Sequence, residues 1–291
     1  MKIVTFKDKN ETETYRIGAV ISENDIADLT SLASDKNLSA AEILGCFDLD
    51  SGFLEKAGKA VEDNNLSKLK RAEIELCAPV PRPGKIICIG LNYRDHAEES
   101  GMAIPASPII FSKFATCAIA AGEAILLPER SEQVDYEAEL AFVIGRRAKN
   151  VSRENAFEYV FGYTNFNDVS ARDFQFADGQ WTRGKSCDTF APMGEFVATK
   201  DEIANPHDLR IRFRLNGETL QDSNTGQLIF KIPELVEFLS RSMTLEPGDI
   251  IATGTPPGVG FARKPPIFLK DGDTAEVEIE DLGVLTNSVR K

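Results

Sequence analysis

The sequence has few cysteines and no arrangement of them that would bind zinc or form a disulfide framework. Its 291 residues include five cysteines, an odd number, which are widely spaced and form no Cys-x-x-Cys pair. This usage indicates reduced thiols in a protein core. No signal-like apolar stretch stands at the N-terminus either, where charged residues follow a short apolar run. These features together predict a soluble, cytoplasmic protein.

The chain also lacks an excess of positive charge and a long apolar run. Lysine and arginine number 33 against 46 aspartates and glutamates, which gives a net charge of −13. Nucleic acid and anionic membranes attract basic patches, so neither is expected as a partner. The most apolar long stretch, residues 117–127, is 11 residues long and includes Glu123, which is too short to span a bilayer.

Alternate prolines divide the sequence into two predicted domains. Pro79, Pro81 and Pro83 disfavour a helix and favour an extended connector. Residues 1–78 are therefore predicted to form a small N-terminal α/β domain, with strands at 3–6 and 15–21 and helices near 40–44 and 53–69. Residues 79–291 form the second predicted domain.

The second domain shows many short strand-like runs and few helices. Helices are predicted at 92–101, 151–161 and 233–243. Strands are predicted at 85–91, 108–113, 138–144, 195–198, 209–215, 249–253 and 276–279, since these runs are rich in Ile, Val and Phe and are separated by turn residues. The predicted fold class is α+β and β-rich, with a roll or barrel-like sandwich in the larger domain.

Residues 179–186 match the P-loop pattern, but their context argues against nucleotide binding. A P-loop follows an apolar strand and opens a helix, whose N-terminal amides hold the phosphates. Here the preceding segment, 172–178, includes Arg172, Asp173 and Asp178 and is not an apolar strand, and the following one contains Pro192 and Gly194. Lys185 is therefore predicted to have another role.

Three acidic residues form a candidate metal site. In a strand over 134–144, Asp135, Glu137 and Glu139 share one face while apolar residues occupy the other. Like charges two residues apart repel each other, and a cation would relieve that repulsion. Asp168, at the end of another strand-like stretch, adds a third hard oxygen ligand of the kind Mg²⁺ or Mn²⁺ prefers. A solvated acidic face, or a turn-capping Asp168, fits the spacing as well.

The chain has only two histidines, and one of them has a carboxylate partner at helical spacing. His96 and Glu99 are three residues apart, so they share a helix face and can form a hydrogen bond. Such a pair suits a general base, although an exposed histidine on a charged helix fits equally well. His207 lies in a turn-like context and is expected at the surface. The loop 253–260, rich in Gly, Pro and Thr, could hold an oxyanion or serve only as structure.

Taken together, these segments resemble the fumarylacetoacetate hydrolase family over about residues 80 to 290. The matching motifs are collinear and lie at residues 89–96, 135–140, 167–173, 184–189 and 253–260. Within the family, residues 263–270 are most similar to the domain-containing-2 branch. The resemblance implies a mixed β-roll with a small N-terminal domain, assembled as a homodimer.

The resemblance also implies roles for individual residues. It assigns Mg²⁺ or Mn²⁺ to Glu137, Glu139 and Asp168. It places the water-activating pair His96 and Glu99 on a lid helix, and it assigns Lys185 to substrate oxygens. It assigns Thr255 to the substrate's carboxylate, and Gly254 of the same loop is predicted to bind substrate with it. Arg172, Arg183 and Lys113 are the other predicted substrate-binding residues, and together with Lys185 these local cations explain how an acidic protein accepts a small anionic 2-oxo acid.

The reaction implied first is hydrolysis of the C–C bond of an acylpyruvate-type 2,4-dioxo acid through a metal-stabilised enolate. Oxaloacetate decarboxylation and keto–enol tautomerisation use the same apparatus and stay open as alternatives, and the domain-containing-2 resemblance favours them. A non-catalytic binder that has kept the fold is the remaining possibility. It is disfavoured because a binder needs no water-activating pair.

Overall fold

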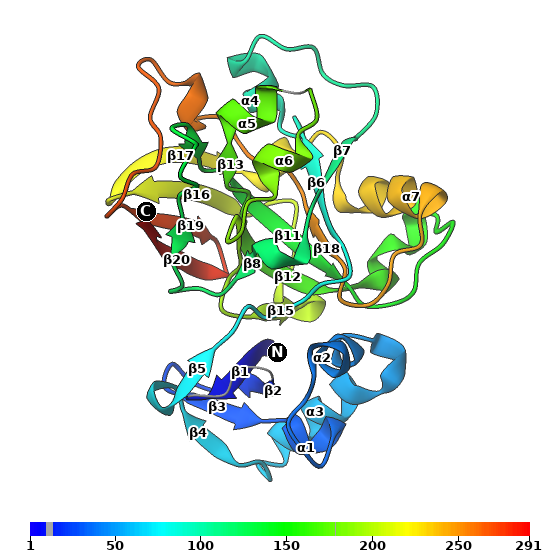
Figure 1. Ribbon diagram of the computed structural model, residues 1–291. Coiled ribbons are helices and arrows are strands. Elements are labelled where there is room, and N and C mark those ends of the chain that lie inside the picture. Colours follow the sequence, from blue (N-terminus) through cyan, green and yellow to red (C-terminus); the bar gives the residue numbers. More distant parts are fainter. Residues whose placement is uncertain (10–13, 178) are drawn as a thin grey trace.

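The computed structural model describes residues 1–9, 14–177 and 179–291 of the chain. One large sheet runs through both the N-terminal part, drawn in blue to cyan, and the remainder of the molecule (Figure 1). Its strands in order are β4 (Lys68–Lys70), β3 (Asp25–Asp28), β2 (Arg16–Val20), β1 (Lys2–Asp8), β15 (Val197–Thr199), β12 (Val160–Asn167), β11 (Ala138–Ile144), β18 (Ile250–Ala252), β6 (Ile86–Gly90) and β7 (Ile109–Lys113), and β5 (Ile74–Leu76) pairs with β1.

A second sheet packs against the middle of the first. Its strands in order are β17 (Glu218–Asn224), β16 (Arg210–Leu215), β19 (Thr274–Ile279), β20 (Gly283–Arg290) and β9 (Ile125–Leu126). Two short pairs complete the strands: β10 (Val134–Asp135) with β13 (Ser170–Ala171), and β14 (Ala191–Pro192) with β8 (Ala118–Ile119).

The helices are short and lie around the sheets (Figure 1). The α-helices are α1 (Thr30–Ala33), α2 (Ala40–Cys46), α3 (Phe53–Glu62), α4 (Arg94–Glu99), α5 (Arg172–Ala177), α6 (Thr182–Lys185) and α7 (Ile232–Ser242). The 3₁₀ helices are η1 (Leu49–Ser51), η2 (Arg71–Glu73), η3 (Ala115–Cys117), η4 (Arg153–Tyr159), η5 (Lys200–Glu202), η6 (Thr225–Gln227) and η7 (Gly260–Ala262). The predicted β-rich α+β class is confirmed.

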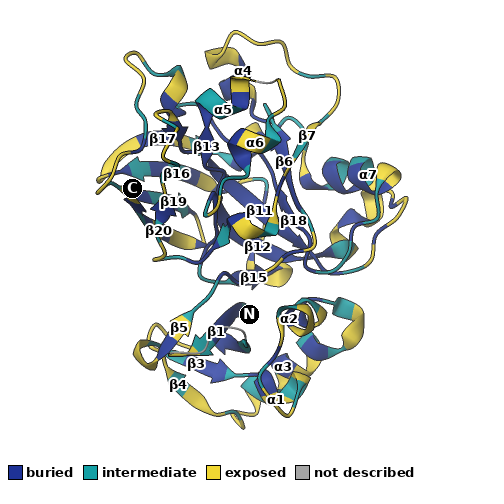
Figure 2. Ribbon diagram, in the orientation of Figure 1, coloured by how far each residue is buried: buried dark blue, intermediate teal, exposed yellow. Residues whose placement is uncertain are grey.

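Strand β11 is the centre of the core, and all seven of its residues are buried (Figure 2). Side chains alternate across a strand, so its two faces serve two apolar clusters. Leu140, Phe142 and Ile144 pack with the second sheet, where the rings of Tyr136 and Phe213 stack with centroids 4.0 Å apart. This double burial explains why the segment is apolar on both faces beyond its acidic start.

The opposite face of β11 packs with the N-terminal part of the chain. Ala141 and Val143 share a cluster with residues such as Ile3 and Phe47, and the ring of Phe47 meets that of Phe161 at 4.8 Å between centroids. Strand β1 pairs with β2, which precedes the proline connector in the sequence, and with β15, which follows it. The large sheet therefore contains strands from both predicted domains. The division into domains at residue 78 therefore stays a prediction.

Several predicted boundaries differ from those observed. The helix predicted over 53–69 ends at Glu62, because the backbone turns into the left-handed region at Asn64 (φ 53°) and a strand follows at residue 68. The helix predicted over 151–161 is the 3₁₀ helix η4. The P-loop match is not a P-loop, since α5 precedes it where an apolar strand is required.

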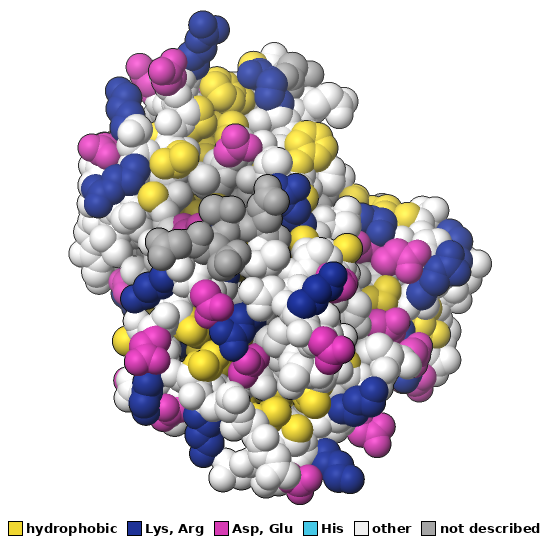
Figure 3. All heavy atoms as spheres, turned by 60° about the horizontal axis from the view of Figure 1, so that its bottom comes forward, with side chains coloured by type: hydrophobic (Ala, Val, Ile, Leu, Met, Phe, Trp, Pro, Cys, Tyr) yellow, Lys and Arg dark blue, Asp and Glu magenta, His cyan; other side chains and the backbone are white. Residues whose placement is uncertain are grey.

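The described cysteines are all free thiols, as predicted. No helix among the described residues is long and apolar enough to cross a membrane. On the face shown in Figure 3, outside the residues drawn in grey, lysine and arginine side chains are interspersed with aspartate and glutamate and form no continuous basic patch.

Candidate active site

Three buried carboxylates meet where β11 begins and β12 ends. These strands are antiparallel with Ala138 opposite Asn167, so the residues just outside that pair, Glu137 and Asp168, become neighbours. The backbone N–H of Asp168 donates to the carbonyl of Glu137 at 2.9 Å. One carboxylate oxygen from each of Glu137, Glu139 and Asp168 lies within 4.8 Å of the others.

Three buried cations surround these acids. Lys185 Nζ donates to Glu137 Oε2 and to Asp168 Oδ2, both at 2.8 Å. Arg172 donates to Glu137 Oε1 at 2.6 Å and to Asp135 Oδ2 at 2.8 Å. Lys113 Nζ bonds Asp168 Oδ1 at 2.5 Å. These ion pairs therefore hold the acidic cluster together.

Glu137 and Glu139 sit in opposite electrostatic environments although they are two residues apart. Burial would raise the pKa of Glu137, but Lys185 and Arg172 overcome it and hold that pKa at about 2. For Glu139, burial raises the pKa well above its ordinary value, and the neighbouring charges of Asp168 and Glu137 raise it further. Glu139 thus has less compensating positive charge around it than Glu137 has.

The donor set fits a divalent cation. Together with Asp135, four buried carboxyls face three buried cations among the described residues, so the cations can balance only three of these acids in ionised form, and Glu139 is the one whose pKa is raised. Carboxylate oxygens are hard ligands that suit Mg²⁺ or Mn²⁺. A metal held by Glu137, Glu139 and Asp168 would supply the positive charge missing at Glu139.

His96 and Glu99 come together on α4, as their spacing predicts. Glu99 Oε2 lies 3.2 Å from His96 Nδ1, which favours the tautomer with the proton on Nδ1 and leaves Nε2 as a base. Glu99 also accepts the backbone N–H of Gly258 at 3.1 Å, so α4 is fastened to the loop after β18. At the other end of α4, Asp95 accepts from Ser223 Oγ on β17 at 2.5 Å.

The loop after β18 hydrogen-bonds to Glu139 and to the backbone of β11 beside it. Gly254 adopts a φ of 101°, and its N–H donates to Glu139 Oε2 at 2.7 Å. Only glycine fits there, because a Cβ would lie 2.8 Å from Asn92 Cβ. Thr255 Oγ1 donates its proton to the carbonyl of Ala138 at 2.9 Å. The hydroxyl proton is thus used within the protein, while Thr255 also lines the cavity described next, and its role in substrate binding stays a prediction.

A cavity of about 310 Å³ opens onto this cluster. Of the predicted residues, it is lined by His96, Glu137, Glu139, Arg172, Lys185 and Thr255. Asp168 and Lys113 are buried behind this lining. Arg183 is not brought into the cavity: it donates to the carbonyl of Phe174 at 3.3 Å and lies over that ring.

Several residues of the cavity were not predicted from the sequence. Gln175 accepts from Arg172 Nη1 at 2.9 Å, three residues along α5, and that spacing was the available signal. Aromatic side chains supply much of the remaining wall, in particular Phe111, Trp181 and Phe261. Trp181 packs closely on the backbone, since a Cβ at Gly90 would lie 2.7 Å from its ring.

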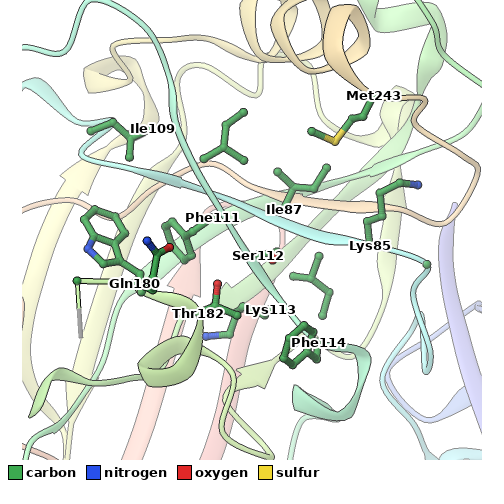
Figure 4. Close-up of a pocket in the computed structure, with 15 residues that line it drawn as sticks. Lys85, Ile87, Ile109, Phe111, Ser112, Lys113, Phe114, Gln180, Thr182 and Met243 are labelled. Atoms are coloured by element: carbon green, nitrogen blue, oxygen red, sulfur yellow. The ribbon is translucent and has the colours of Figure 1, made fainter. Parts of the chain in front are cut away.

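A second hollow, of about 660 Å³, follows the outer strand β7 (Figure 4). Its labelled apolar side chains include Ile87, Phe114 and Met243. Ile109, Phe111 and Trp181 line both hollows. These three side chains therefore form a shared wall between the second hollow and the acidic cavity.

Residues 85–290 match the fumarylacetoacetate (FAA) hydrolase C-terminal family. Together with the fold and the buried acidic site, this match makes the chain an enzyme of the fumarylacetoacetate hydrolase family, as the motifs indicated.

Individual relatives indicate which members of the family the chain is similar to. The chain is 44% identical to the mitochondrial oxaloacetate tautomerase fahd2 of Xenopus laevis, over 99% of this chain and 90% of that protein. It is 48% identical to the human mitochondrial oxaloacetate tautomerase FAHD2A, over 77% of this chain and 72% of that protein. Among solved structures, maleylpyruvate hydrolase from Sphingobium sp. SYK-6, in complex with manganese(II) and pyruvate, matches with a TM-score of 0.82 and 30% identity, over 100% of this chain and 99% of that chain.

These relatives contradict the predicted cellular location and favour a different reaction from the one implied first. The expectation of a cytoplasmic protein is contradicted, because the curated tautomerases at 44% and 48% identity are mitochondrial. Reduced cysteines, on which that expectation rested, do not distinguish one reducing compartment from another. The same relatives favour oxaloacetate chemistry over the C–C hydrolysis that was implied first.

Proposed function

We propose that this protein is a divalent-metal-dependent oxaloacetate tautomerase, which interconverts the keto and enol forms of a small anionic 2-oxo acid. The observation that carries the proposal is the pairing of a histidine base with a buried acidic triad in one cavity. His96, Glu137, Glu139 and Lys185 all line that cavity. The oxaloacetate tautomerases described above support the choice of reaction.

In this proposal, His96 moves the proton. Keto–enol exchange breaks the C3–H bond and forms an O–H bond at C2, with no net change in composition. His96 Nε2 would take the proton from C3 while Glu99, at 3.2 Å from Nδ1, stabilises the imidazolium that forms. The same proton can then be returned to the substrate oxygen.

The cations would stabilise the negative charge that develops on the 2-oxo oxygen. Lys185 is buried, and although burial would lower its pKa, Asp168 and Glu137 raise that pKa above the ordinary value, so it stays an ammonium. A metal held by Glu137, Glu139 and Asp168 would supply Lewis acidity to the same oxygen. Arg172 keeps Glu137 ionised and in place for that metal.

An ultraviolet progress curve on enol-oxaloacetate tests the proposal. Metal-stripped protein would be compared with protein given Mg²⁺ or Mn²⁺, and pyruvate would be measured in parallel. We expect metal-dependent loss of enol absorbance without pyruvate, and no catalysis by Glu139→Gln. Stoichiometric pyruvate would instead identify a decarboxylase, and no metal-dependent change would refute the proposal.

Hydrolysis of an acylpyruvate is the second candidate. The His96–Glu99 pair favours it, because a base oriented by a carboxylate also suits activation of water. Metal-dependent release of pyruvate from an acylpyruvate, with no acceleration of the oxaloacetate tautomers, would establish it. We also propose that the protein is a homodimer, which light scattering of the purified protein tests.

A further inference from the structure

A buried glutamine outside the cavity makes hydrogen bonds to two segments of the candidate site. Gln221 lies on β17 and is 1% exposed. Its Oε1 accepts the backbone N–H of Ala138 at 3.0 Å. Its Nε2 donates to Thr255 Oγ1 at 2.9 Å and to the carbonyl of Pro256 at 2.8 Å. The single amide thus connects the second sheet to both β11 and the loop after β18.

The bond to Ala138 fixes the backbone between two proposed metal ligands. Ala138 stands between Glu137 and Glu139, so a shift of its peptide groups would move both carboxylates. Thr255 holds the same residue, because its hydroxyl donates to the carbonyl of Ala138. Ala138, Gln221 and Thr255 therefore form a closed ring of hydrogen bonds.

The bonds to Thr255 and Pro256 fix the loop that reaches Glu139. The neighbouring Gly254 N–H donates directly to Glu139 Oε2. Farther along, the Gly258 N–H donates to Glu99. A displacement of this loop would therefore move groups that hydrogen-bond both to the acidic triad and to α4, the helix that carries His96.

We propose that Gln221 is a positioning residue, which sets the spacing of Glu137 and Glu139 and holds the Thr255 loop against them. It does not line the cavity, so it acts through Ala138 and Thr255 and not on the substrate. Hydrogen-bonding partners of metal ligands typically change metal affinity by about 10- to 100-fold when they are removed. The inference rests on the proposed metal site and not on which reaction the enzyme catalyses.

The test compares Gln221→Met with a matched variant, Asn287→Leu, in the full-length protein. Asn287, on β20, is also a buried amide, and its Nδ2 donates to the carbonyls of Ala120 and Glu123 at 2.9 and 2.8 Å, in the segment between β8 and β9. Both substitutions remove a buried amide and are expected to lower thermal stability. Mn²⁺ affinity, by calorimetry and by electron paramagnetic resonance, would be measured at a temperature at which both variants are folded.

We expect Gln221→Met to weaken Mn²⁺ binding by about 10- to 100-fold while Asn287→Leu leaves it unchanged. Hydrogen–deuterium exchange of residues 254–260 gives a metal-free measurement, and it should accelerate only in Gln221→Met. Wild-type affinity in Gln221→Met, or equal losses in both variants, would overturn the inference. If the wild type binds no Mn²⁺, the exchange measurement decides alone, and a wild-type exchange rate of residues 254–260 in Gln221→Met would overturn the inference. Gln221→Asn, a shorter amide, replaces Gln221→Met if the latter does not fold.

Discussion

The two neighbouring glutamates of the triad should respond in opposite directions to the same substitution. In metal-stripped protein, Glu139 is a buried carboxyl beside two like charges, all within 4.8 Å. Two like charges at that distance repel by about 3 kcal/mol at an effective dielectric constant of 20. The neighbouring cations offset part of this, so Glu139→Gln should stabilise the metal-free fold by about 1–2 kcal/mol. The midpoint of thermal unfolding should then rise by roughly 2–3 °C, because the unfolding entropy of a 291-residue chain is large.

Glu137→Gln should destabilise the metal-free fold. The ionised form of Glu137 is stabilised in the folded state, since its pKa falls from 4.5 to about 2. At neutral pH that difference corresponds to about 3 kcal/mol, which the amide loses together with its ion pairs to Lys185 and Arg172. Glu278→Gln serves as the control, because that carboxylate lies in a partly exposed salt-bridge ladder and should change stability by less than about 1 kcal/mol.

Calorimetry or circular dichroism in the presence of a chelator, and then of excess Mn²⁺, measures these effects. Wild-type protein at 100 times its dissociation constant should gain about 2.7 kcal/mol from the metal, and neither triad variant should. If both variants shift the chelated protein in the same direction, or if Glu139→Gln lowers its stability, the electrostatic reasoning is wrong.

The remaining predictions concern the base, a pH effect and two glycines. His96→Gln should reduce kcat/KM on enol-oxaloacetate by about 10²- to 10⁴-fold with thermal stability and Mn²⁺ affinity unchanged, and full activity would exclude His96 as the base. Burial and then Lys231 hold the pKa of His207 at about 4, and its Nε2 accepts the N–H of Ile232 at the start of α7. The unfolded chain therefore binds a proton first as the pH falls from 6.5 towards 4, and the wild type should lose about 1 kcal/mol more stability over that range than His207→Gln, after allowance for partial exposure. Urea titrations at pH 7 and pH 5 measure this difference, and equal pH slopes would contradict it. Gly162→Ala should destabilise the protein by more than about 3 kcal/mol, because its Cβ would lie 2.0 Å from the carbonyl oxygen of Ala198. Gly45→Ala, in α2 with open space around it, should stabilise by about 0.5–1 kcal/mol in the same titrations.

Short sequence patterns predicted those parts of the fold that depend on neighbouring residues in the chain. The alternation in residues 134–144 predicted which side chains face the core and which acids share a face, because a strand has a two-residue period. Pattern alone did not predict where α3 ends, since its amphipathic character continues past Glu62 while Asn64 turns the backbone. Strand β20 was not predicted, because its Thr, Asn and Ser residues weaken the apolar signal.

The candidate site was predictable where motifs carry the chemistry, and not where partners come from distant segments. Glu137 and Glu139 share a face as the strand period predicted, and Asp168 joins them as the family resemblance implied. The bonds of Thr255 to Ala138 and of Arg183 to Phe174 were not predicted, and the substrate roles of both residues stay predictions. Gln221 lies 83 residues from Ala138 in the chain, and an amide at that separation leaves no local pattern.

The shared wall between the two hollows also has a spectroscopic consequence. Trp181 is the chain's only tryptophan, it borders both hollows, and its ring meets that of Phe111 at 5.4 Å between centroids. The tryptophan fluorescence of the native protein therefore comes from a single indole beside the acidic cavity. A ligand that enters either hollow displaces water from that indole and changes its emission, so the unlabelled enzyme contains its own optical reporter of occupancy.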